Sequence, residues 1–140
     1  MSNELSKALY AKVTGDNTFN TAIGGTASVA GRFYPDGDKK IETATKPYAT
    51  YLIISQVPDD TLDAEIDNVL IQIKNVSDTD SKSTVDANNK LLRDLLQGVK
   101  LTLTVYKGVQ LFRTNQIPAM KDENKLDWIS TTDFRTKMQK

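Results

Sequence analysis

The chain has 140 residues, the size of one domain, and its 18 basic and 18 acidic residues cancel to a formal net charge of zero. It contains no cysteine and no histidine, which excludes disulfides, thiolate nucleophiles, Cys-ligated metal sites and Ser-His-Asp machinery. The balanced charge argues against a bulk attraction to nucleic acid or to an anionic membrane. No apolar run approaches the roughly 20 residues that span a bilayer, so we expect no contact with a membrane.

Hydrophobic spacing in the first half predicts two helical segments followed by three strands. Apolar residues three and four positions apart predict a helix over residues 4–14, and a short helical turn follows over residues 16–23. Alternation predicts strands over residues 26–34, 48–57 and 65–76, with a polar loop over residues 36–46. In the third strand, Val69, Ile71 and Ile73 share one face, which is typical of a half-buried antiparallel strand.

In the second half, one predicted helix is followed by three predicted strands. Helical spacing runs from Thr84 to Leu96, and a strictly alternating strand is predicted over residues 99–106. A two-residue turn at Lys107-Gly108 would join it to a partner strand over residues 109–116. After a polar loop over residues 118–125, a last strand is predicted over residues 126–136. The order predicts an α+β fold over residues 1–140, a single domain with a mostly antiparallel β-sheet and helices packed on one face.

An acidic segment before the second helix begins like a calcium-binding loop. Asp78 and Asp80 would be its first and third ligands, but the fifth position is Lys82 and the twelfth is Asn89. A cation inside the loop repels calcium, so we interpret these residues as capping the helix N-terminus.

A second acidic motif, Glu123-Asn124-Lys125, has the spacing found in metal-dependent nucleases. Its candidate partner, Asp59, lies 64 residues upstream, and no predicted unit brings the two together. We interpret the triplet as part of a solvated loop. The sequence therefore predicts no catalytic residue, no metal site and no cofactor, and we expect a protein that is not an enzyme.

The zero net charge hides an uneven distribution. Residues 1–70 hold six basic and ten acidic residues, and residues 71–140 hold twelve basic and eight acidic residues. The extremes are an acidic stretch and a basic tail, made of Asp59, Asp60, Asp63, Glu65 and Asp67 and of Arg135, Lys137 and Lys140. One interpretation is a solvated surface. The other is a self-complementary subunit whose acidic patch meets the basic patch of the next copy in a head-to-tail ring.

A series of short segments has a recognisable order and spacing along nearly the whole chain. They are Ala8-Leu9-Tyr10, Ile23-Gly24-Gly25, Arg32-Phe33-Tyr34-Pro35, Pro47-Tyr48, Val69–Ile73, Leu91–Leu96, Phe112-Arg113, Trp128 and Asp133-Phe134. Pro47-Tyr48, followed by the strand–helix–strand unit, is the most characteristic of them. This layout resembles the tail-completion family of tailed bacteriophages, which are also described as tail terminator or head–tail joining proteins.

The resemblance implies a structural protein of the virion, located in the tail or neck and assembled in the bacterial host cytoplasm. Members form a ring, usually hexameric, at the head-proximal end of the tail tube, which is typically the long, non-contractile tube of a siphophage. The ring stops polymerisation of the tail tube protein and joins the tail to the neck or connector (head completion) protein, and DNA passes through its lumen without sequence recognition. No cofactor is implied.

Two polar loops are candidates for contacts between rings. Residues 35–46, with Lys39 and Lys40, and residues 118–125, with Lys121 and Lys125, would order on assembly. Two other classes of function remain open at this point: a monomeric soluble binding module or assembly chaperone, and a small carboxylate-dependent hydrolase.

Overall fold

The computed structural model describes residues 2–26, 28–58, 66–77, 82–104, 106, 109–121 and 127–139. Its described strands form one sheet in the order β1-β2-β3-β5-β4, in which β1 and β2 are parallel and the other neighbours antiparallel. The strands are β1 (Phe33–Pro35), β2 (Tyr48–Pro58), β3 (Ile66–Ser77), β4 (Phe112–Lys121) and β5 (Trp128–Gln139). The helices are α1 (Ser2–Thr14), α2 (Asn17–Ala22), α3 (Lys82–Leu96) and the 3-10 helix η1 (Lys39–Thr43). The predicted α+β fold with a mostly antiparallel sheet is confirmed.

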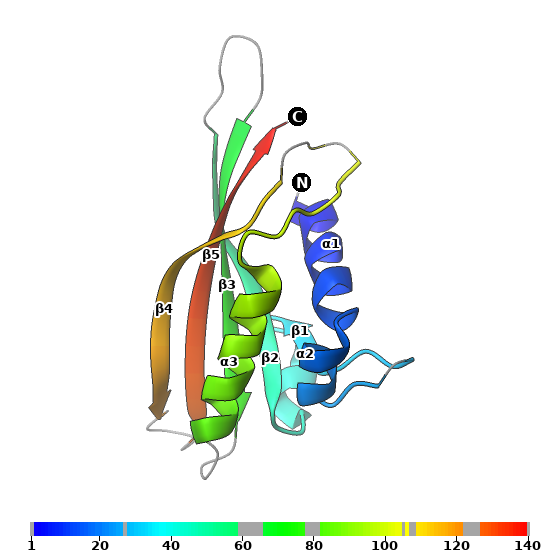
Figure 1. Ribbon diagram of the computed structural model, residues 1–140, viewed down its shortest axis with the longest axis vertical. Coiled ribbons are helices and arrows are strands. Elements are labelled where there is room, and N and C mark those ends of the chain that lie inside the picture. Colours follow the sequence, from blue (N-terminus) through cyan, green and yellow to red (C-terminus); the bar gives the residue numbers. More distant parts are fainter. Residues whose placement is uncertain are drawn as a thin grey trace.

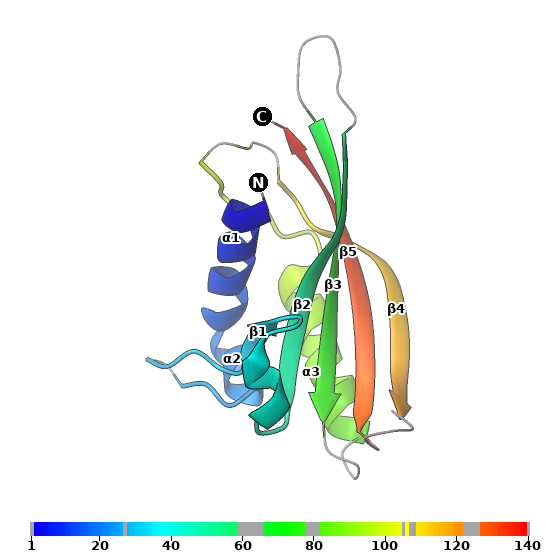
Figure 2. The same ribbon diagram turned by 180° about the vertical axis from the view of Figure 1, so that it is seen from behind.

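The helices α1, α2 and α3 lie on the same side of the sheet (Figures 1 and 2). The other side carries no described helix, and we call it the open face. In α1 the predicted apolar stripe is confirmed, because Leu5, Leu9 and Val13 are fully buried. α2 begins after Asp16, whose Oδ2 accepts a hydrogen bond of 2.9 Å from the Phe19 N–H and so caps the helix.

The two middle strands, β3 and β5, form the regular part of the sheet. Their register continues without a break from Ile66 opposite Gln139 to Ser77 opposite Trp128. The predicted alternation in β3 is confirmed, since Val69, Ile71 and Ile73 are buried and the residues between them are only half-buried. The buried row faces the helices and, with Phe134 of β5, forms the centre of the core.

The predicted strand over residues 26–34 is wrong for most of its length, because strand pairing begins only at Phe33. The reason is the buried side chain of Asn20, at the middle of α2. Its Nδ2 donates to the Thr26 and Val29 carbonyls, and its Oδ1 accepts from the Gly31 N–H at 2.6 Å. One amide thus binds the backbone groups that a strand would have needed, and the segment wraps around it.

The predicted strand over residues 99–106 is also wrong. Its described part forms only one isolated bridge, Lys100 opposite Gln110, flanked by backbone bonds from the Leu101 N–H to the Val109 carbonyl and from the Leu111 N–H to the Val99 carbonyl. The predicted turn residues, Lys107 and Gly108, lie outside the described residues. The alternation instead buries Leu101, Val109 and Leu111 in the core beside α1.

The second strand of that predicted hairpin is shifted along the chain. β4 starts at Phe112 rather than at residue 109 and continues to Lys121, so it includes the first part of the polar loop predicted over residues 118–125. Its partner is β5, with breaks in register between Arg113 and Asn115 and between Ile117 and Met120. β4 therefore forms the border of the sheet (Figure 1).

Candidate assembly surfaces

The charged residues predicted to form an interface are only partly within the described chain. Asp59, Asp60, Asp63, Glu65 and Lys140 lie outside it. Asp67, at the start of β3, is half-buried opposite Met138, which is fully buried in the core. Arg135 and Lys137 are exposed on β5 and alternate with the buried Phe134, Thr136 and Met138, so they belong to the open face.

The structure brings the described acidic and basic residues to the same end of the sheet in one chain. Lys137 is opposite Asn68, and Asp67 is opposite Met138, the residue after Lys137. Because residues opposite each other point to the same face, Asp67 lies on the helix side and Lys137 on the open face. The complementarity of the two patches between copies stays a prediction.

The lysines predicted as loop contacts occupy different structures. Lys39 and Lys40 are exposed in η1, where the Lys40 N–H donates to Asp38 Oδ1 at 3.0 Å. Lys121 is the last residue of β4, which corrects the predicted start of the loop, and its contact with another ring stays a prediction. Lys125 lies outside the described residues.

A compact polar group joins the start of β2 to the start of β5. The Lys46 ammonium lies 2.6 Å from Asp127 Oδ1, and the Asp127 side chain is only 6% exposed. The ring of Trp128, the next residue, lies beneath two ammonium groups, those of Lys82 at 5.7 Å and Lys121 at 5.8 Å from the ring centroid. This group fixes the end of the sheet where β4 and β5 meet the start of α3.

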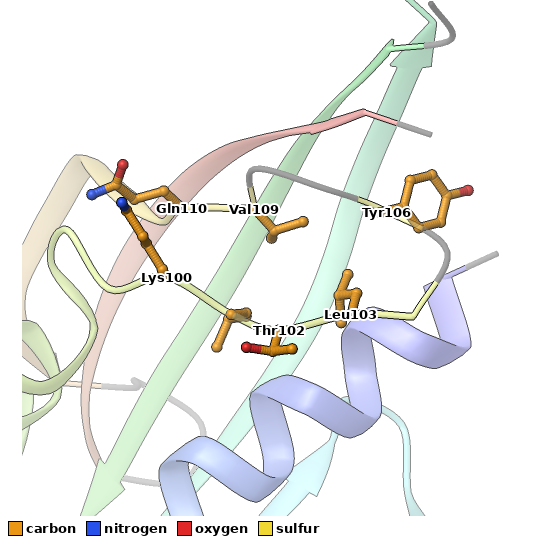
Figure 3. A pocket seen from close by; sticks show the side chains of 7 residues that line it. Lys100, Thr102, Leu103, Tyr106, Val109 and Gln110 are labelled. Carbon is orange, nitrogen blue, oxygen red and sulfur yellow. The ribbon is translucent and has the colours of Figure 1, made fainter.

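A hollow at the described surface has a volume of about 520 Å³ and lies beside the segment between α3 and β4. Figure 3 shows the side chains that line it: Lys100, Leu101, Thr102, Leu103, Tyr106, Val109 and Gln110. None of these lining residues is a carboxylate. The main chain beside it is held to α1, since the Thr104 N–H donates to Glu4 Oε1.

Other signs of chemistry are weak in the part of the chain that is described. It holds no cluster of three or more carboxylates that could bind a metal ion, and none of its helices is long and apolar enough to cross a membrane. Asn89, the twelfth position of the calcium-loop motif, is buried and accepts a 2.5 Å hydrogen bond from the Thr132 hydroxyl. Asp78, Asp80, Asp59 and the Glu123–Lys125 triplet lie outside the described residues.

Two tyrosines at the β1–β2 border have raised pKa values. Burial raises the pKa of Tyr48, and the charge of Asp127 adds to this while Lys46 opposes it. Burial also raises the pKa of Tyr51, with smaller contributions from Tyr10 and Asp38. Both phenols therefore stay protonated near neutral pH, which makes them hydrogen-bonding and packing groups and not bases.

A surface that sequence patterns did not indicate lies along the outer strands. The described residues expose seven large apolar side chains, of which five belong to β2 or β4. They are Leu52, Ile54, Phe112, Ile117 and Met120, with exposed fractions of 39% to 59%. The alternation of these residues is typical of strands. Their exposure, however, depends on which strand lies at the border of the sheet, and the tertiary structure decides that.

Comparison with known proteins identifies the family of the chain. Residues 7–139 match the model of the family described as tail completion protein gp17. The chain belongs to this family. It is thus a structural protein of a phage tail, and the resemblance that its sequence layout indicated is confirmed.

The fold is also similar to one already solved. A chain from the structure titled "Virion of native gene transfer agent (GTA) particle" superposes with a TM-score of 0.80 over 99% of this chain and 97% of that chain. The two sequences are 16% identical, so this likeness concerns the fold. No curated protein matches this chain in sequence.

Proposed function

We propose that the protein forms a ring at the head-proximal end of the phage tail tube, where it terminates tube polymerisation and joins the tail to the neck or connector. The observation that carries this proposal is the family match, which extends over residues 7–139 and so includes every strand of the sheet. The similarity of the whole fold to a chain from a virion particle supports the same role.

The surface of the subunit is suited to such assembly. A ring needs two different contact surfaces on each subunit, and its closure depends on the angle between them. The two borders of the sheet supply distinct surfaces that carry exposed apolar side chains, on β2 and on β4. In this proposal the ring is a hexamer by analogy with the family, its other contacts are the tail tube and neck proteins, and DNA crosses its lumen without sequence recognition.

Mass spectrometry of purified virions tests the location, and electron microscopy of virions lacking the protein tests the role. We expect the chain in intact particles, and we expect its absence to give free tails of irregular length that do not join heads. A chain missing from the particle, with normal tails formed only when it is present in the cell, would instead identify an assembly chaperone and overturn the proposal.

A further inference from the structure

The two borders of the sheet present strand edges that no further described strand covers completely. β1 covers only the first part of β2, with Phe33, Tyr34 and Pro35 opposite Ala49, Thr50 and Tyr51. The Tyr51 carbonyl accepts a bond of 2.8 Å from the Asp36 N–H, and no described strand continues along that side of β2 (Figure 2). Since backbone groups alternate sides along a strand, those of Ile53 point to the same uncovered side. At the opposite border, β5 is the one described strand beside β4, and the Arg113 N–H of β4 donates to Gln97 Oε1 at 2.7 Å.

Both borders expose apolar side chains, and those of β2 lie in a strand without a charged residue. An uncovered strand edge invites pairing with another chain, and soluble monomers block it with charges, prolines or irregular strands. β2 contains no charged residue from Tyr48 to Pro58, and it exposes Leu52 by 40% and Ile54 by 45%. In the upper part of β4, Phe112 is 46% exposed. The middle strands, β3 and β5, expose no large apolar side chain among their described residues.

The apolar residues of both borders lie on one face of the sheet. Leu52 is opposite Gln72, Gln72 is opposite Asp133, and Asp133 is opposite Asn115 of β4. In the neighbouring row, Phe112 is opposite Arg135. Both rows alternate with core residues, so they belong to the open face. Joining the two borders at the same height would place Leu52 of one copy opposite Asn115 of another, with Phe112 in the next row on the same face.

The uncovered part of β2 and the first part of β4 also lie at the same height across the sheet, and each has a break in register there, between Ile53 and Ser55 and between Arg113 and Asn115. One row leads from Leu52 to Asn115, and the next leads from Ser55 through Leu70 and Arg135 to Phe112. Below this height, β1 covers β2, and Pro118 removes a backbone donor from β4. The segments that lie at equivalent levels of neighbouring copies are therefore residues 52–55 and 112–115.

Strand direction is compatible with a closed ring. β2 is antiparallel to β3, β3 to β5 and β5 to β4, so β2 and β4 run in opposite directions. Rotation about a ring axis along the strands preserves direction, so β4 of one copy beside β2 of the next makes an antiparallel pair. The charges do not oppose it. β4 carries only the basic Arg113 and Lys121, and the exposed Asp36 adjoins the β2 edge.

We infer that residues 112–115 of one copy pair with residues 52–55 of the next, so that adjacent sheets of the ring become continuous. This inference rests on the proposed ring and adds the surface that closes it. The occupant of each border is a second copy of this chain, and the bonds are backbone hydrogen bonds covered by the Leu52 and Phe112 side chains. The pairing is a case of strand addition, in which backbone bonds give affinity and side chains set the register.

Disulfide trapping tests the pairing cleanly because the chain has no cysteine. In the double variant Leu52→Cys/Asn115→Cys, the two positions of one copy are separated by three strand spacings, about 14 Å, which no disulfide bridges. Any bond must therefore join two copies. The test uses the purified chain and virions that carry it, oxidised and separated on non-reducing gels. We expect a ladder ending at the closed ring, which collapses to monomer on reduction.

The matched control moves one cysteine to an equally accessible helix position. Asp94 is exposed on α3, on the other side of the sheet, so Leu52→Cys/Asp94→Cys should give no ladder. A second variant without cysteines, Phe112→Asp, should shift the sedimentation of rings toward monomer while the urea midpoint of the monomer stays unchanged. This variant tests the contact even if the double variant folds poorly.

The outcomes separate this inference from the proposed function. Virions that contain the chain but yield no ladder would overturn the strand pairing and leave the tail role intact. A chain that is absent from virions and yields no ladder in either preparation would overturn both. A ladder from the Leu52→Cys/Asn115→Cys chain, together with loss of rings in Phe112→Asp, would establish the pairing.

Discussion

The middle and the border of the sheet differ in how many partners their strands have within the subunit. β3 and β5 pair over an unbroken register and bury one face against the helices. β4 pairs with β5 through two irregularities, and seven consecutive residues from Phe112 to Pro118 are exposed. A strand in the middle receives backbone partners on both sides, whereas a border strand receives them on one. The middle therefore carries the stability of the subunit, and the border is available for contacts with other chains.

The largest expected effect contrasts two phenylalanines on either side of this division. Phe134 in β5 is 0% exposed, and Phe134→Ala should lower the free energy of unfolding by about 3–5 kcal/mol because it removes core contacts and leaves a cavity. Phe112 in β4 is 46% exposed, and Phe112→Ala should change the monomer by less than about 1 kcal/mol. Urea unfolding of both variants measures the difference, and similar losses would contradict the division.

A smaller effect is expected from the hydroxyls of two threonines. Thr132 is 1% exposed and donates to Asn89 Oδ1 of α3, so Thr132→Val leaves a buried acceptor unpaired and should cost about 1–3 kcal/mol. Thr114 of β4 is exposed, and its hydroxyl lies 3.4 Å from the Asp133 carbonyl. Thr114→Val should stay within about 0.5 kcal/mol of the parent in the same unfolding experiment. Equal costs would show that the polar bonds at the border matter as much as those inside.

The smallest expected effect is a change of stability with pH that involves Tyr51, at the β1–β2 border, and it is absent at neutral pH. Burial raises the pKa of Tyr51 above its usual value near 10. Above pH 10 the unfolded chain releases this proton before the folded chain does, so stability should fall as pH rises. Tyr51→Phe removes the group, and its free energy of unfolding should decline less steeply than that of the parent above pH 10. Parallel curves for the two proteins would contradict the raised pKa.

Much of the fold could be predicted from the sequence because its strongest signals are local. The spacing of Leu5, Leu9 and Val13 predicts a helix face, and the alternation of Val69, Ile71 and Ile73 predicts a half-buried strand, and the structure confirms both. Residues 26–34 and 99–106 also alternate, yet most of the first and the described part of the second form no strand. Alternation indicates which side chains can share a face, but it does not reveal whether Asn20 will bind the backbone first.

The candidate site was predicted less well, for a related reason. Charge patterns drew attention to Asp67, Arg135 and Lys137, which share one end of the sheet in the structure and whose role between copies is still a prediction. The apolar borders were not predicted. Whether Leu52 is exposed depends on β1 ending at Pro35, and whether Phe112 is exposed depends on β4 having no outer neighbour.

The sequence by itself determined the absence of cysteine and histidine, the two main helices, the alternation of β3 and the layout by which the tail completion family could be recognised. These properties depend on residue identity and on neighbours a few positions away. Only the tertiary structure decided the strand order, the side-chain bonds of Asn20 and the border position of β4. Each of these results from competition between distant segments for the same backbone groups and the same core, and neither composition nor periodicity encodes which segment wins.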